Sequence, residues 1–185
     1  MKERIIDSTW QQILKYGVKR FTVQDIATDL GISKKTIYAH FDSKEEIIAA
    51  VCANLAAADQ AAHTEAMEAQ TGFFERVDSL INAHSHRRMP LTFRSDLKRY
   101  YPEIFARYMS LEFLKDIYHE LLAQGLKEGY IRSDIHPLIL ELVLGKCMEA
   151  FDDTQLLTEY DITLQQGLHI LRDVLLYGVL APDRH

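Results

Sequence analysis

The stretch that decides the fold is Thr22–Glu46, TVQDIATDLGISKKTIYAHFDSKEE, which contains two short helical patterns joined by a tight turn. In the first pattern, apolar residues recur at helical spacing and form one stripe: Val23, Ile26, Ala27 and Leu30. Thr22 and Asp25 predict a capping box at the start of this helix. Gly31 supplies the left-handed backbone conformation that commonly ends a helix.

The second pattern begins at Ser33, a residue suited to cap a helix. We expect Ile37 and Phe41 to face inward. The residues expected to face outward are Lys34, Lys35, Tyr38 and His40. Helix, short glycine turn and helix is the geometry of a helix-turn-helix, whose second helix lies in the DNA major groove.

The charges at the start of the second helix break a local rule. First turns favour Asp or Glu because the N-terminal end of the helix dipole is positive, yet this helix opens with Lys34 and Lys35. Residues that break local rules often serve a partner, and DNA phosphates suit lysines. The alternative, a pair of solvated lysines, leaves the capped turn around them unexplained.

The same stretch resembles the DNA-binding segment of the TetR family of transcriptional regulators. The positions that carry the resemblance are Thr22, Ile26-Ala27, Gly31-Ile32-Ser33, Thr36-Ile37-Tyr38, Phe41 and Ser43-Lys44-Glu45-Glu46. The resemblance implies an all-α chain with an N-terminal three-helix helix-turn-helix DNA-binding domain plus a larger C-terminal helical ligand-binding and dimerisation domain. One departure is Lys35, at a position where the family usually has a small residue.

The resemblance also assigns DNA contacts. It implies that Thr22 and Lys44 touch phosphates, whereas the second helix reads bases, a division that is general among DNA-binding proteins. Lys35 is our candidate for a direct contact to guanine, and Tyr38 and His40 for contacts to phosphate or a thymine methyl group. The full set of candidate DNA-binding residues is Thr22, Ser33, Lys34, Lys35, Thr36, Tyr38, His40 and Lys44.

Charge is distributed unevenly along the 185 residues, whose net charge is −6. Residues 1–50 hold eight Lys/Arg and seven Asp/Glu, a net charge of +1, so the remainder carries −7. The acidic excess therefore lies outside the part expected to meet DNA, where it would repel DNA. A hydrophobic content of 48%, with four prolines and eight glycines, favours an ordered, all-helical chain.

We divide the chain into a DNA-binding domain at 1–46 and an effector-binding and dimerisation domain at 47–185. The helix capped by Ser43 is expected to continue beyond Leu55 into the second domain, so that its tilt would set the position of the DNA-binding part. No long helix is expected between Leu91 and Pro102. The other expected helices cover 2–16, 73–89, 105–128, a segment starting at Pro137, and 161–179.

The last two helices are apolar on more sides than one chain can cover. The family resemblance implies that this pair forms a four-helix bundle with its twin, so a homodimer on a palindromic operator is expected. The alternative is that both helices complete a monomer core. The candidate interface residues are Leu138, Leu142, Phe151, Leu164, Leu168, Leu171 and Leu175.

Aromatic and methionine side chains are frequent in the middle of the chain. Such residues are usually core, but the resemblance implies a ligand cavity in this region, and such cavities are mostly apolar. We expect a small, largely hydrophobic effector that releases DNA, with repression as the family habit. The candidate pocket residues are Phe73, Phe93, Tyr101, Phe105, Tyr108, Met109, Phe113, Met148 and Phe151.

Other functional classes find little support. No HExxH, phosphate-binding glycine loop, nucleophile elbow or CxxC motif supports an enzyme or a cofactor. His84 and His86 would point to nearly opposite faces of a helix, which argues against a metal site. Two lone cysteines and no membrane-length apolar run favour a cytoplasmic protein without a membrane anchor. A protein-binding adaptor would leave Lys34 and Lys35 without a role.

Overall fold

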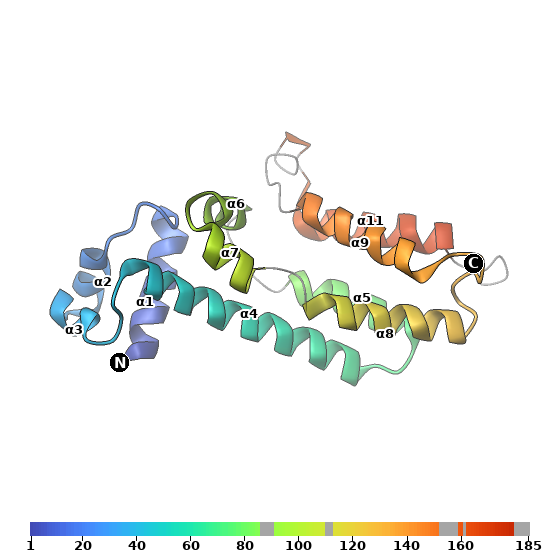
Figure 1. Ribbon diagram of the computed structural model, residues 1–185, viewed down its shortest axis with the longest axis horizontal. Helices are drawn as coiled ribbons and strands as arrows, with labels where there is room; N and C mark the ends of the chain where they lie inside the picture. The colour runs from blue at the N-terminus through green and yellow to red at the C-terminus, as the bar shows by residue number, and fades with distance from the viewer. Residues whose placement is uncertain (86–90, 110–112, 152–158, 161, 180–185) are drawn as a thin grey trace. The chain divides into compact units, whose positions relative to one another are not determined.

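The computed structural model of the chain describes residues 1–85, 91–109, 113–151, 159–160 and 162–179. Within these ranges the elements are α-helices and no strand is present, which confirms the all-α prediction (Figure 1). Packing divides the chain into two compact units. Unit 1 comprises residues 1–58 and 89–110, and unit 2 comprises residues 59–88 and 111–185.

Helix α4 (Lys44–Ala69) is continuous and contributes residues to both units. The boundary expected between residues 46 and 47 falls near the start of this helix, whereas the packing boundary falls after Ala58. The expectation that the helix capped by Ser43 passes from one part of the chain into the other is therefore met by α4.

Unit 1 contains α1 (Lys2–Tyr16), α2 (Val23–Leu30), α3 (Lys34–Tyr38), the first part of α4, α6 (Leu91–Tyr100) and α7 (Pro102–Tyr108). Its core draws a fully buried residue from almost every element because each helix turns one apolar stripe inward. Side chains with at most 1% exposure include Ile5, Ile13, Phe21, Ile26, Ile37, Phe41, Ile47, Ile48 and Leu97.

The expected caps of the helix-turn-helix are present. Thr22 and Asp25 form a capping box, and Gly31 takes the left-handed conformation with φ of 64°. Ser33 Oγ accepts a hydrogen bond from Thr36 N at 3.1 Å. Helix α3 is shorter than expected, since it ends at Tyr38, and the buried Phe41 follows it in the turn that leads to α4.

The segment between residues 91 and 128 corrects two expectations. A ten-residue helix, α6, forms where we expected a short, broken segment, because Phe93 and Leu97 lie one turn apart and both bury into the core of unit 1. The single long helix expected from Phe105 to Glu128 is instead two helices. Helix α7 begins with Pro102 in its first turn and ends at Tyr108, and α8 is Phe113–Lys127.

Unit 2 contains the last part of α4 with α5 (Phe73–Ser85), α8, α9 (Pro137–Phe151) and α11 (Leu164–Val179). Helix α9 starts at Pro137 as expected, whereas α11 starts three residues later than expected, after the Thr163 cap. The core residues are Met67, Phe73, Leu80, Leu121, Leu122, Ile131 and Leu140. Glycine is required at 125, because a Cβ there would lie 2.7 Å from atoms of Ile131 and of Phe73.

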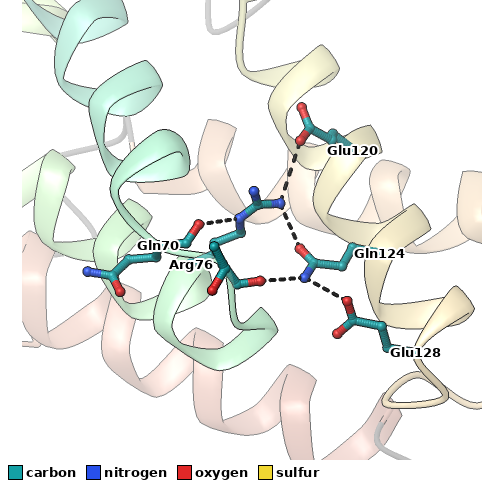
Figure 2. A network of polar contacts seen from close by, with 6 residues as sticks. Gln70, Arg76, Glu120, Gln124 and Glu128 are labelled. Atoms are coloured by element: carbon teal, nitrogen blue, oxygen red, sulfur yellow. Dashed lines mark hydrogen bonds and ion pairs between the residues drawn. The ribbon is translucent and has the colours of Figure 1, made fainter.

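A polar network fastens the end of α4 to α5 and α8 within unit 2 (Figure 2). Arg76 donates from Nε to the Gln70 carbonyl at 2.9 Å and from Nη1 to Gln124 Oε1 at 2.8 Å. Gln124 Nε2 donates in turn to the Thr71 carbonyl at 2.9 Å and to Glu128 Oε1 at 3.0 Å. The network supplies hydrogen bonds to the two carbonyls that follow α4, which have no helical partner.

Candidate nucleic-acid interface and ligand-binding region

The outward face of α3 presents two cations and a phenol. Lys34, Lys35 and Tyr38 are exposed, with 48% exposure for Tyr38, while Ile37 between them is fully buried. Within the described part of the chain, neither lysine has an ion-pair partner. Ile37 therefore anchors the helix and fixes the direction in which its three exposed neighbours point.

The other candidate DNA-binding residues of this segment differ in their position and in whether their side chains already form hydrogen bonds. His40 is exposed but lies in the turn after α3 rather than on the helix. Ser33 Oγ and Thr36 Oγ1 lie 3.0 Å apart and form a hydrogen bond. Ser33 caps the start of α3, and the Thr36 hydroxyl contacts this cap.

Thr22 is exposed, and its side chain belongs to the capping box of α2. Asp25 accepts hydrogen bonds from Thr22 Oγ1 at 2.8 Å and from Thr22 N at 2.6 Å. These hydrogen bonds from Thr22 hold the pKa of the Asp25 carboxyl below its usual value. The start of α2 is thus ordered by its own side chains.

Lys44 points into unit 1 rather than away from it. Its Nζ donates to the Phe21 carbonyl at 2.7 Å and to the Lys19 carbonyl at 3.1 Å, and it lies 4.1 Å from the centre of the Phe21 ring. Partial burial lowers the pKa of Lys44, an effect that Glu45 and Asp25 oppose. The ammonium therefore joins the start of α4 to the α1–α2 connection.

The start of α4 is capped in a variant of the expected way. Ser43 Oγ accepts from Glu46 N at 3.1 Å, as a capping box requires. The Glu46 carboxylate, however, accepts from the Asp42 backbone N–H at 2.5 Å, one residue earlier than in the standard box. As in the standard capping box, these two hydrogen bonds hold the residues before α4 against the first turn of the helix.

Unit 2 contains a half-open cavity of about 110 Å³ lined by residues of α5, α8, α9 and α11 and by Ile131. Its lining is aliphatic and aromatic, apart from Tyr118 and Arg172. The lining residues include Phe73, Val77, Leu80, Leu121, Ile131, Leu140, Leu144, Leu168, Leu171 and Leu175. Such an apolar enclosure with few polar groups has the character of a small-molecule site.

The structure divides the candidate pocket residues between the two units. Phe73 lines the cavity, whereas Phe93 and Met109 are buried in the core of unit 1, with Tyr101, Phe105 and Tyr108 packed against them. Phe151 belongs to unit 2 but not to the cavity lining. The side chains of Phe113 and Met148 lie outside the described residues.

Helices α9 and α11, which lie side by side (Figure 1), carry exposed apolar residues. We call this set the outer apolar surface, and its members are Leu138, Ile139, Leu142, Val143, Ile170, Val174 and Tyr177, each 42–72% exposed. Leu138 and Leu142 of the candidate interface belong to it. Leu168, Leu171 and Leu175 instead line the cavity, Phe151 is half-buried, and the Leu164 side chain lies outside the described residues.

Sequence reasoning missed most of the outer apolar surface because α11 carries two apolar stripes. Leu168, Leu171 and Leu175 form one of them, the stripe that the sequence analysis predicts for the interface. Ile170, Val174 and Tyr177 form a second stripe at the same helical spacing, and these are the exposed ones. Both stripes are apolar and have the same spacing, so the sequence offers no signal that distinguishes them.

Two further candidates concern metals and membranes. Of the histidines weighed as metal ligands, His86 and the side chain of His84 lie outside the described residues. Among the helices that the structure describes, none combines the length and the apolar character needed to cross a lipid bilayer.

The capped helix-turn-helix, with a short second helix that exposes lysines, defines a DNA-binding protein of the helix-turn-helix class. Residues 5–51 match the family described as bacterial regulatory proteins, tetR family. The N-terminal part of the chain thus carries the DNA-binding segment of TetR-family transcriptional regulators, and the chain is similar to such regulators.

Similarity extends over the whole chain. A helix-turn-helix transcriptional regulator of Bacillus subtilis, YvaF, is 25% identical over 99% of this chain and 97% of its own length. The fatty acid degradation regulator FadR of Bacillus halodurans has a similar fold, with a TM-score of 0.71 and 19% identity over 95% of this chain and 98% of that one. The reduced form of E. coli NemR gives a TM-score of 0.73 at 14% identity, over 97% and 96% of the two chains.

Proposed function

We propose that this regulator is a repressor that binds a palindromic operator as a homodimer and is released by a small, largely hydrophobic effector. The observation that carries the proposal is the pairing of exposed Lys34 and Lys35 on α3 with the fully buried Ile37 behind them. Cations held in one direction by a rigid anchor suit a protein that must meet DNA in one register.

We assign the DNA contacts to bases or to phosphates according to where each side chain lies and whether it already caps a helix. Lys35 and Tyr38, which are exposed on α3, read base edges, with guanine as the base that a lysine suits best. Lys34 and His40 contact phosphates. Thr22, Ser33 and Thr36 place their capped helix starts against the DNA backbone, where N-terminal N–H groups favour phosphate.

Lys44 contributes to DNA binding in one of two ways. It contacts a phosphate, as the family resemblance implies, or it positions the segment before α2 through the Lys19 and Phe21 carbonyls. Two of its three N–H donors are already used by these carbonyls, which favours the positioning role.

The outer apolar surface is the dimer interface of the proposed assembly. Seven large apolar side chains that are 42–72% exposed on two adjacent helices are unusual for a monomer and typical of a surface that binds another protein. In a two-fold dimer the same surface of each chain meets its own copy, which places two α3 helices on two half-sites.

The effector enters the cavity of unit 2. Binding there acts on the packing of α5, α8, α9 and α11, and the Arg76 network ties α5 and α8 to the end of α4. Because α4 also belongs to unit 1, a change in its position reaches the DNA-binding part. The effector releases DNA only to the extent that it binds the two states with different affinity.

Selection from random duplexes, followed by salt titration of the chosen operator, tests the proposal. Lys34→Ala should make the slope of log affinity against log salt about one unit shallower, as loss of one phosphate contact requires. Lys35→Ala should cost about 1–3 kcal/mol at one base pair and relax the preference there. The matched control is Lys127→Ala on α8, which should change neither quantity.

The same titration separates the two roles of Lys44. If Lys44 contacts phosphate, Lys44→Ala makes the salt slope shallower. If it positions the segment before α2, affinity falls while the slope stays unchanged. A wild-type protein that selects no sequence, or that binds DNA with no salt dependence, contradicts the proposed function.

A further inference from the structure

The cavity of unit 2 contains only two polar side chains among its fifteen lining residues, Tyr118 and Arg172. A bound molecule would therefore be recognised mainly by shape and apolar contact. Its polar atoms would have to match one or both of these groups, since unmatched polar groups in an apolar site cost binding energy.

Arg172 is already neutralised. Its Nη1 donates to Asp78 Oδ1 at 2.6 Å and its Nε to Asp173 Oδ1 at 2.8 Å. These two carboxylates raise the pKa of the guanidinium and leave one excess negative charge beside it. An anionic ligand would be repelled by Asp78 and Asp173, so Arg172 makes a poor anion site.

Tyr118 is in the opposite situation. Within the residues that the structure describes, its hydroxyl makes no hydrogen bond, although the ring lines the cavity. The surrounding apolar atoms raise the pKa of Tyr118 to about 12, so the hydroxyl keeps its proton at neutral pH. The hydroxyl of this half-buried tyrosine is therefore a hydrogen-bond donor without a protein acceptor among the described residues.

The volume limits the size of the ligand. A cavity of about 110 Å³ is somewhat smaller than the apolar cavity of about 150 Å³ that holds benzene in an unrelated protein. Because the cavity is half open, a molecule with a single six-membered ring can occupy it with part of its surface outside, whereas long acyl chains and fused ring systems would extend well beyond it.

We propose that unit 2 binds an uncharged, mostly apolar compound the size of one six-membered ring, whose carbonyl or ether oxygen accepts a hydrogen bond from Tyr118. The role of this compound as the effector rests on the proposed function, but its binding does not. The specificity follows from the Tyr118 hydroxyl, which has no partner among the described residues, and from Arg172, whose carboxylate partners exclude anions.

The test uses two probes of equal shape, cyclohexanone and methylenecyclohexane, which differ in having an oxygen or a CH2 group at one position. Binding to the full-length protein is measured by ligand-detected NMR at millimolar probe. Tyr118→Phe removes only the hydroxyl and leaves no buried donor unpaired, so it should fold at least as stably as the wild type. Tyr160→Phe, at a residue 65% exposed, is the matched control.

Tyr118→Phe should weaken cyclohexanone binding about three- to ten-fold, the value of one hydrogen bond, and leave methylenecyclohexane binding unchanged. Tyr160→Phe should affect neither probe. Val77→Phe, which fills the cavity, should abolish binding of both. Cyclohexanecarboxylate should bind the wild type more weakly than cyclohexanone.

Three results would overturn the inference: no cyclohexanone binding to the wild type, an equal effect of Tyr118→Phe on both probes, or tighter binding of the carboxylate. A gel-shift assay on the same samples tests the proposed function separately. If cyclohexanone binds through Tyr118 but leaves the DNA complex intact, the ligand inference stands and the effector role fails. If no duplex is bound at all, the proposed function fails while the probe result is unaffected.

Discussion

The two units differ in how completely they bury their own apolar residues. In unit 1, Ile5, Ile26 and Ile37 have no exposed surface and belong to one continuous apolar cluster. In unit 2, Leu121 and Leu140 keep 7% exposure beside a cavity, and the outer apolar surface lies open.

This difference in apolar burial fits the proposed roles of the two units, DNA binding for unit 1 and effector binding with dimerisation for unit 2. A DNA-binding part must hold its exposed side chains in one direction, so it needs a core that is complete without help. A part that binds a ligand and a second chain must leave apolar area unburied until they arrive. Under the proposed function, unit 2 would gain stability by binding an effector and a second chain, whereas the core of unit 1 is buried within the single chain.

The largest expected effect comes from breaking the proposed pairing of unit 2. Val174 is 65% exposed on α11, and Val174→Glu would bury a charge in the dimer interface. We expect the variant to be monomeric at micromolar concentration by analytical ultracentrifugation. We also expect its operator affinity to fall about 10²–10⁴-fold, because the two half-sites are no longer bound by linked chains.

Leu14→Glu is the control for this variant, since Leu14 is a 37% exposed apolar residue on α1 of unit 1. It should leave the oligomeric state unchanged. A Val174→Glu protein that sediments like the wild type would remove the outer apolar surface from the dimer.

The next effect compares the two cores directly. Ile26→Ala should cost about 2–5 kcal/mol, because a fully packed site cannot collapse around the missing atoms. Leu121→Ala should lie at the low end of that range, since Leu121 borders a cavity and already lacks neighbours on one side. Urea unfolding followed by Trp10 fluorescence reports on unit 1, and circular dichroism reports on both units.

Trp10 is suited to this comparison because it is the single tryptophan and packs edge-on against Phe93, with ring centres 5.3 Å apart in unit 1. The midpoint by fluorescence should shift for Ile26→Ala and not for Leu121→Ala. Equal shifts by both probes for both variants would mean that the two units unfold as one.

A smaller effect is expected where unit 2 holds the end of α4 (Figure 2). Arg76→Ala removes the donors to the Gln70 carbonyl and to Gln124. Because the network is partly exposed, the loss should be at most about 1 kcal/mol, seen as up to about five-fold faster amide exchange in the last turn of α4. Arg132→Ala, which removes a surface pair with Asp134, should leave this exchange unchanged.

The smallest effect concerns the cap of α2 in unit 1. Hydrogen bonds from Thr22 hold the pKa of Asp25 below its ordinary value, so its contribution to stability is present above that ordinary pKa and is lost as the pH falls through the folded value. Asp25→Ala should therefore lower the melting temperature at pH 7, and the gap from the wild type should narrow as the pH falls below about 4. Glu68→Ala on α4 should show no such narrowing.

Unit 1 was largely predictable because its signals are local. Caps at Thr22 and Ser33, the left-handed Gly31 and the buried Ile37 each follow from residues a few positions apart. The family resemblance added the assignment to DNA. What was missed in unit 1, the helix α6, depends on the burial of Phe93 and Leu97 against residues far away in sequence.

Unit 2 was less predictable because its helices carry apolar residues on several faces. Periodicity alone gives α11 two equivalent stripes, and only the packed structure distinguishes the inward Leu171 from the outward Val174. Tyr118 gave no signal, since a lone tyrosine on a helix has no motif. The candidate pocket drawn from aromatic content joined residues of two separate cores, such as Phe73 and Phe93.

Helix α3 is five residues long, too short to persist in water by itself, so its shape is imposed entirely by Ile37 and by the turn around it. The residue that holds α3 in place, Ile37, is therefore different from the exposed residues that are proposed to contact bases. Under the proposed contacts, substitutions at Lys35 or Tyr38 would alter which bases are preferred without touching Ile37, which keeps the helix in place. Duplicated copies of such a gene can diverge toward new operators one exposed position at a time.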